Sequence, residues 1–86
     1  MTRSFIMSDR RLTGHQIAGR LESTLGRNCH YSPFLPDWQK GEGSLVDNTS
    51  AGVVGKVLRQ EGGTFIEISG GRGDFIASLK EIAVEI

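Results

Sequence analysis

The second half of the chain, residues 51–86, consists of short β-branched runs separated by glycines. Glycine pairs at 62–63 and 70–71 stand where hairpin turns belong, because glycine adopts the positive φ angles of tight turns without strain. A further glycine, Gly55, lies inside the run GVVGKV, where it marks a sharp bend or a close approach of another backbone. This pattern predicts a bent meander of short antiparallel strands.

The alternation of apolar and polar residues assigns an inner and an outer face to these strands. Residues 64–69 alternate throughout, and residues 74–79 are interpreted as the next strand. The last strand covers residues 82–86, with its three branched side chains inward and Ala83 and Glu85 outward. Short, strongly twisted strands of this kind close most readily on themselves, so the sequence predicts a small barrel.

One helix is predicted over about residues 14–25. Thr13 and Gln16 have the spacing of a capping box, in which each side chain accepts a hydrogen bond from the backbone N–H of the other residue. Gly26 stands at the position of a left-handed C-cap. The apolar stripe that docks this helix on the rest of the protein is Ile17, Leu21 and Leu25.

Residues 27–50 contain prolines and glycines that prevent a long regular element. The segment nevertheless holds three of the six aromatic residues (one Trp, one Tyr and four Phe), namely Tyr31, Phe34 and Trp38. We interpret it as an ordered strap packed across an open end of the sheet. The alternative, an aromatic platform over residues 31–38 that binds a partner or a nucleic-acid base, stays open.

At 86 residues the chain is a single domain with a thin core. We divide it into an N-terminal segment (1–12), the capped helix (13–26), the strap (27–50) and the barrel strands (51–86). Cys29 is the one cysteine of the sequence, so an internal disulfide is excluded. Self-association is therefore expected to contribute the stability that a small core lacks.

Catalytic residues, metal ligands and a cofactor site are not predicted. His15, Cys29 and His30 lack the spacing of a zinc site, and the adjacent Cys29 and His30 point to opposite sides of an extended segment. The sequence GGRGD at 70–74 lacks the lysine of a phosphate-binding loop and a predicted helix behind it. It is interpreted as a tight hairpin turn.

The sequence contains neither a run of 18 apolar residues nor the pattern of a signal peptide. We therefore expect a cytoplasmic protein that does not contact membranes. Whether Met1 or Met7 is the true start stays open, and a start at Met7 would make residues 1–6 dispensable.

The order of one helix followed by short strands resembles the Sm-like (LSm) family of small β-barrels. The resemblance covers residues 53–86, where VVGKV at 53–57 is similar to the apolar-x-Gly-x-apolar core of the family's first motif. Phe65 stands where the family carries its base-reading asparagine. Arg72-Gly73 looks like the family's second motif but precedes its usual place. This likeness implies a mostly β fold, a small, strongly bent SH3-like or Sm-like barrel of four to five short antiparallel strands preceded by one N-terminal α-helix.

The Sm-like resemblance also implies a function. It predicts a non-enzymatic protein that forms a homo-oligomeric ring of about five to seven subunits and binds single-stranded RNA or DNA in nucleic-acid processing. The candidate nucleic-acid-binding residues are Lys56, Arg59, Phe65, Arg72 and Lys80. The alternative is a structural or protein–protein interaction barrel of another SH3-like or PRC-barrel type, without a nucleic-acid role.

Overall fold

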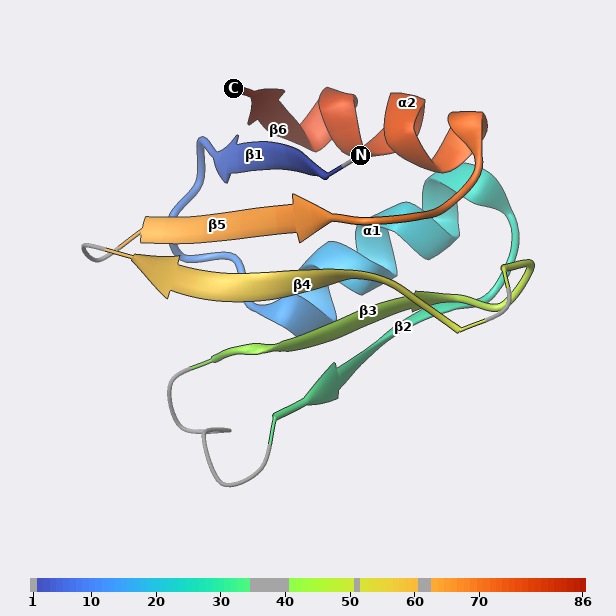
Figure 1. Ribbon diagram of the computed structural model, residues 1–86, viewed down its shortest axis with the longest axis horizontal. Coiled ribbons are helices and arrows are strands. Elements are labelled where there is room, and N and C mark those ends of the chain that lie inside the picture. Colours follow the sequence, from blue (N-terminus) through green and yellow to red (C-terminus); the bar gives the residue numbers. More distant parts are fainter. Residues whose placement is uncertain (1, 35–40, 51, 61–62) are drawn as a thin grey trace.

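The computed structural model describes residues 2–34, 41–50, 52–60 and 63–86, which form one six-stranded antiparallel sheet and two helices (Figure 1). The order of the strands across the sheet is β2-β3-β4-β5-β1-β6. The helices are α1 (Gly14–Leu25) and α2 (Gly73–Ile82). The strands are β1 (Arg3–Met7), β2 (Cys29–Pro33), β3 (Gly43–Asp47), β4 (Val53–Gln60), β5 (Gly63–Ile68) and β6 (Ala83–Glu85).

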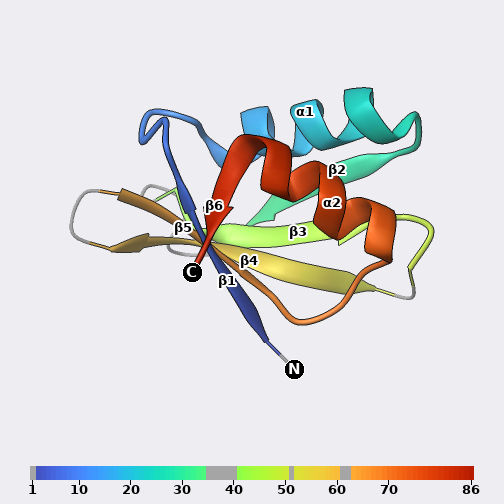
Figure 2. The same ribbon diagram turned by 90° about the horizontal axis from the view of Figure 1, so that it is seen from above.

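Both helices cover the same face of the sheet, as Figure 2 shows from above. α1 buries Ile17 and Leu21, and α2 buries Phe75 and Leu79, in one cluster with the inward side chains of the strands. The largest buried side chains of the strands in this cluster are Phe5, Met7, Leu45, Val54, Val57, Ile66 and Ile68. Among the described residues, the opposite face of the sheet carries no helix (Figure 2), and we call it the helix-free face.

The mostly β fold predicted from the sequence is confirmed, whereas closure into a barrel is not observed. β2 and β6 lie at the two edges of an open sheet. The sheet also contains more strands than the four to five predicted, because β1, β2 and β3 come from segments that were expected to be irregular. The core is closed by the two helices rather than by the sheet folding over on itself.

The strand predicted over residues 74–79 is wrong, because these residues belong to helix α2. Phe75, Leu79 and Ile82 follow the i, i+4, i+7 spacing of a helix face, and the alternating pattern fails at Ala77, which is exposed. The hairpin predicted at GGRGD is wrong for the same reason. Arg72 is the N-cap residue of α2 and Gly73 is its first residue.

The N-terminal segment contains an inner strand of the sheet, next to the edge strand β6. β1 pairs with β5 on one side and with β6 on the other. Phe5 is fully buried and Met7 is 1% exposed. Residues 3–6 belong to this strand and are therefore not dispensable for the fold, contrary to the possibility raised by a start at Met7.

The strap predicted over residues 27–50 is largely a β-hairpin-like pair, β2 and β3, in register from Cys29 opposite Asp47 to Pro33 opposite Gly43. Tyr31 is buried, as expected for a strap. Its ring occupies the space that a Cβ would need at Gly14 and at Gly43, so both positions require glycine. Leu35 and Trp38 lie outside the described residues, and the aromatic-platform alternative is untested there.

The predicted helix at 14–25 is confirmed together with both caps. Gln16 N–H donates to Thr13 Oγ1 (3.2 Å), and Thr13 N–H donates to Gln16 Oε1 (2.8 Å). Gly26 has the left-handed φ of 69° and donates its N–H to Glu22 O (2.9 Å). The chain therefore ends α1 at the residue that can adopt this conformation without strain.

The capping box gives a stability prediction. Replacing Thr13 by alanine should lower the free energy of unfolding by about 1 kcal/mol, because the first turn of α1 loses an acceptor for a backbone N–H. Urea unfolding followed by circular dichroism measures this loss. The matched change at exposed Ser23 on the same helix should alter the midpoint little, and equal losses at both positions would contradict the role of the cap.

The close backbone approach predicted at Gly55 is confirmed. A Cβ at this position would lie 2.4 Å from Ile68 Cδ1 and 2.7 Å from the carbonyl oxygen of Glu67. The register between β3 and β4 shifts next to this point, between Leu45 and Val46. The glycine thus lets β4 bend and pack tightly against β5.

The faces predicted for the last strand are reversed. Ala83 is 6% exposed and belongs to the core, while Val84 and Ile86 are 61% and 66% exposed. The Glu85 carboxylate forms an ion pair with Lys80 of α2 (3.1 Å). β6 begins at Ala83, directly after α2, with the Ala83 side chain in the core. Because side chains alternate along a strand, Val84 and Ile86 do not share this face, and Val84 lies with Ile6 on the helix-free face.

Candidate interaction surface

A row of apolar side chains crosses four neighbouring strands on the helix-free face. Leu58 of β4 is opposite Phe65 of β5, Phe65 is opposite Ile6 of β1, and Ile6 is opposite Val84 of β6. We call these four residues the apolar row. Ile6 is 41% exposed and Val84 is 61% exposed, whereas Leu58 and Phe65 are half-buried. The row is a continuous apolar stripe that the protein's own helices do not cover.

A hollow of about 350 Å³ adjoins the apolar row at the end of β5. Ile6 and Phe65 form its apolar wall. The other lining residues are Arg10, Gln60, Gly63 and Thr64. The hollow extends the apolar row toward the last residue of β4, Gln60, and the first residue of β5, Gly63.

A parallel row of polar side chains runs beside the apolar row. Ser44 of β3 is opposite Lys56 of β4, Lys56 is opposite Glu67 of β5, and Glu67 is opposite Ser4 of β1. We call these four residues the polar row. Lys56 is exposed and Glu67 is half-buried. The helix-free face therefore carries one cation and one anion side by side at the centre of the sheet.

The structure separates the five candidate nucleic-acid-binding residues. Lys56 and Phe65 lie on the helix-free face, but Arg59 extends from the other side of β4 and donates to Thr64 Oγ1 and to Arg10 O (3.3 Å). Arg72 lies at the start of α2, with its Nε 3.7 Å from an Asp74 carboxylate oxygen. Lys80 is engaged by Glu85. These residues do not form one basic surface.

A second hollow, of about 440 Å³, lies between the GGRG segment and the end of β1. Arg3 and Lys80 are among its lining residues, and both interact with Glu85, at 3.9 and 3.1 Å. The single Glu85 carboxylate therefore offsets one of the two positive charges at this hollow.

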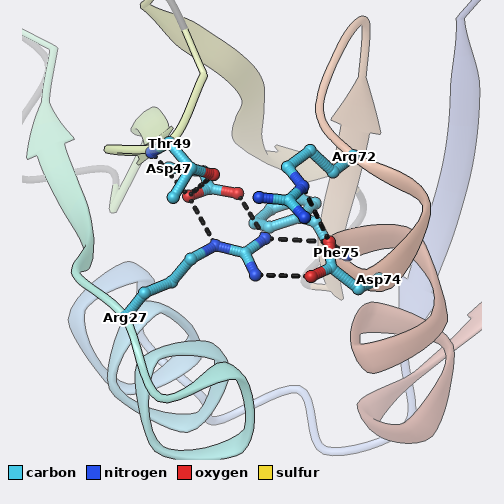
Figure 3. Close-up of polar contacts among 6 residues, drawn as sticks. All are labelled: Arg27, Asp47, Thr49, Arg72, Asp74 and Phe75. Atoms are coloured by element: carbon cyan, nitrogen blue, oxygen red, sulfur yellow. Dashed lines mark hydrogen bonds and ion pairs between the residues drawn. The ribbon is translucent and has the colours of Figure 1, made fainter.

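An ion-pair cluster joins three elements on the helix-covered side (Figure 3). Arg27, which follows α1, donates from Nε (3.0 Å) and Nη2 (2.8 Å) to the two carboxylate oxygens of Asp47 in β3. Its Nη1 and Nη2 also donate to Asp74 of α2, at 2.5 and 2.9 Å. Thr49 donates its N–H and its hydroxyl to Asp47 Oδ1. One guanidinium thus ties α1, β3 and α2 together.

This cluster shifts the pKa values of its acids. The hydrogen bonds from Arg27 lower the pKa of Asp47 to about 2, although burial opposes the shift. The same guanidinium lowers the pKa of Asp74. The Asp47 side chain is fully buried and its charge is fully paired. The cluster is a stabilising contact between elements and has no group free for catalysis.

The described residues contain no grouping of three or more His, Cys, Asp or Glu side chains that could hold a metal ion. Cys29 is buried and His30 is exposed, so the two point to opposite sides, as predicted. Burial raises the pKa of the Cys29 thiol, which disfavours the reactive thiolate. Within the same part of the chain, every buried side-chain nitrogen or oxygen has a hydrogen-bond partner.

Comparison of the chain with models of protein families, with curated proteins and with solved structures found no significant match. None of the helices in the described ranges is long and apolar enough to span a membrane. The candidate surface is therefore assigned from the geometry of this fold alone.

Sequence reasoning did not find the apolar row. Phe65 was singled out for nucleic-acid binding, but Leu58, Ile6 and Val84 were not connected with it. The sequence RSFIM at 3–7 did contain a signal, since Phe5 and Met7 alternate with Ile6 as in a strand. The pairing of this strand between β5 and β6 could not be deduced from local pattern.

Proposed function

We propose that this protein is a non-enzymatic protein–protein interaction module that self-associates through the helix-free face. The observation that supports the proposal is the apolar row, which gathers large side chains of four strands on a face without a helix. In proteins surrounded by water, contiguous exposed apolar side chains of this kind mark surfaces that contact another protein. Burial of this row between two chains would remove it from water.

Two further properties favour a second copy of the chain as the partner. The formal net charge of the sequence is zero, so two copies do not repel each other through their overall charge. The core of an 86-residue chain is also small, and association adds buried apolar area that the single chain lacks. The proposed compartment is the cytoplasm, on the sequence grounds given above.

The ring of about five to seven subunits, the membership of the Sm-like family and the binding of single-stranded RNA or DNA stay predictions. Lys56 and Phe65 are the two candidate residues on the proposed interaction face, so a nucleic acid would compete there with the second copy. The separation of Arg59, Arg72 and Lys80 from that face favours the interaction module over the nucleic-acid binder.

The test of the proposed function is a charge placed in the apolar row. Ile6→Asp should weaken self-association about tenfold or more, because a carboxylate at this exposed position would lose its water on association; tenfold corresponds to about 1.4 kcal/mol. Sedimentation equilibrium gives the association constant, and circular dichroism shows whether the variant is folded.

Ser23→Asp is the matched control, since it adds the same charge at an exposed position of α1 on the helix-covered side. It should associate as the wild type does. A folded Ile6→Asp variant with wild-type association would overturn the proposed function. If that variant does not fold, Val84→Asp at the exposed edge strand takes its place with the same expectation.

A further inference from the structure

The pattern of the helix-free face is nearly self-complementary about the line between β4 and β5. β4 and β5 are the two central strands of the sheet. Lys56 of β4 is directly opposite Glu67 of β5. In the adjacent apolar row, Leu58 and Phe65 flank the same line. One strand out, Ser44 and Ser4 flank it in the polar row. Each of these residues thus has a counterpart across the line, whereas Ile6 and Val84 of the apolar row lie on the β5 side of the line alone.

We infer that two copies pack their helix-free faces together around a two-fold axis. The axis runs parallel to the strands and lies between the two packed faces, over the line that separates β4 from β5. This inference rests on the proposed function and adds the arrangement. A half-turn about such an axis turns one sheet over, so β4 of one copy lies on β5 of the other. Lys56 then meets Glu67 of the second copy, and Leu58 meets Phe65 of the second copy. The contact is isologous and repeats each pair twice.

Charge favours this arrangement over rotation about an axis perpendicular to the strands. An axis of that kind through the polar row would place Lys56 on Lys56 and Glu67 on Glu67 of the second copy, and like charges in contact are unfavourable. Within the described residues, no carboxylate lies within 4.0 Å of the Lys56 ammonium group.

The size of the face sets the strength that this contact can have. Six strands about 4.8 Å apart span about 24 Å, and five residues at about 3.3 Å span about 17 Å, which gives a flat footprint of about 400 Å². The accessible area of the side chains exceeds this footprint. An axis near the middle of the sheet covers nearly the whole face, and its flat footprint is about half of the area of about 800 Å² per partner that stable interfaces bury, so a weak, reversible contact is expected.

The experiment mixes two charge-reversed variants. In Lys56→Glu, each interface pair becomes Glu with Glu, and in Glu67→Lys each becomes Lys with Lys. Each variant alone should self-associate about tenfold or more weakly than the wild type. An equimolar mixture should form a heterodimer with an affinity near that of the wild type, because both of its pairs join Glu with Lys. Sedimentation equilibrium on the separate and mixed samples measures this.

The matched control pair is Arg20→Glu and Glu22→Lys, which make the same charge changes at exposed positions of α1. Each control variant should self-associate as the wild type does, alone and in the mixture. A cross-strand effect within one chain cannot produce recovery on mixing, because each variant chain keeps its own sequence. Recovery by the 56/67 mixture together with wild-type behaviour of the controls supports the arrangement.

The register is tested by thiol cross-linking. Ser44→Cys and Ser4→Cys chains, mixed, should be joined by a short bifunctional thiol reagent into a heterodimer, and each alone should give several-fold less product. Wild-type protein is the blank, since Cys29 is 5% exposed. Variants at 56 and 67 that associate as the wild type does would overturn the arrangement and leave the proposed function standing. Weakened variants without recovery would overturn the arrangement too, and a monomeric wild type would overturn both.

Discussion

A variant chain that begins at Met7 is expected to be unfolded. The truncation removes Phe5, which is fully buried, and most of the strand that joins β5 to β6. Loss of a buried Phe side chain alone costs about 3–5 kcal/mol, and the backbone hydrogen bonds of two strand pairs are lost with it. A domain of this size has a stability of only a few kcal/mol. Circular dichroism and the dispersion of amide NMR signals measure the outcome.

The control for this truncation removes Thr2 alone, which precedes β1. A chain in which a start methionine directly precedes Arg3 keeps the whole of β1 and should unfold at the wild-type urea midpoint. A Met7-start protein that melts like the wild type would contradict the placement of β1 between β5 and β6.

The second large effect is expected at Asp47. Replacing it by asparagine should lower the free energy of unfolding at neutral pH by about 2–3 kcal/mol, because Arg27 loses the fully buried one of its two charged partners and keeps only Asp74. The matched control is Glu85→Gln in the partly exposed pair with Lys80, where the expected loss is about 0–1 kcal/mol. Urea unfolding of both variants compares the two losses.

The loss caused by Asp47→Asn should depend on pH. The pKa of Asp47 is about 2 in the folded protein, below its ordinary value of 3.8. A carboxyl group whose folded pKa is lowered stabilises the protein fully above its unfolded pKa, and this contribution disappears as pH falls toward the folded pKa. The wild type should therefore lose about 2 kcal/mol through this group between about pH 4 and pH 2.

The asparagine variant lacks that titration, so the difference between the two proteins should shrink over the same pH interval. Unfolding free energies at about pH 7 and about pH 2.5 test this. An unchanged difference at both values would mean that the ionised Asp47 does not carry the stabilisation.

The parts of the fold that the sequence predicted are those set by local chemistry. The capping box of Thr13 and Gln16 and the C-cap glycine Gly26 define α1 within a short stretch of chain. The β4–β5 pair follows from alternating residues and a glycine turn, and Gly55 follows from its place inside a strand. In each case the signal and the contact that it reports lie close together in sequence.

The elements that the sequence did not predict depend on distant contacts or on a choice between two periods. The segment 74–82 has apolar residues that fit both a strand and a helix over its first six positions, and the packing of Phe75 and Leu79 against α1 and the sheet favours the helix. β1 is a five-residue strand whose partners lie some 60 and 80 residues away along the chain, as in the pairs of Phe5 with Ile66 and with Glu85.

The candidate surface was predictable only in part, for the same reason. Lys56 and Phe65 were selected from the sequence, and they do lie on the helix-free face. The apolar row needs the long-range pairing of Ile6 with Phe65 and with Val84. The reversed faces of β6 follow from the end of α2, where Ala83 N–H still donates to Leu79 O and turns Ala83 toward the core.

The most direct test of the central claim is the mass of the wild-type protein in solution as a function of concentration. Sedimentation equilibrium should show a reversible shift from 9.4 kDa toward twice that value, 18.8 kDa, as concentration rises through the micromolar range. Saturation at the dimer mass would agree with two helix-free faces packed together. A mass that stays at 9.4 kDa over the whole range would contradict self-association through this face.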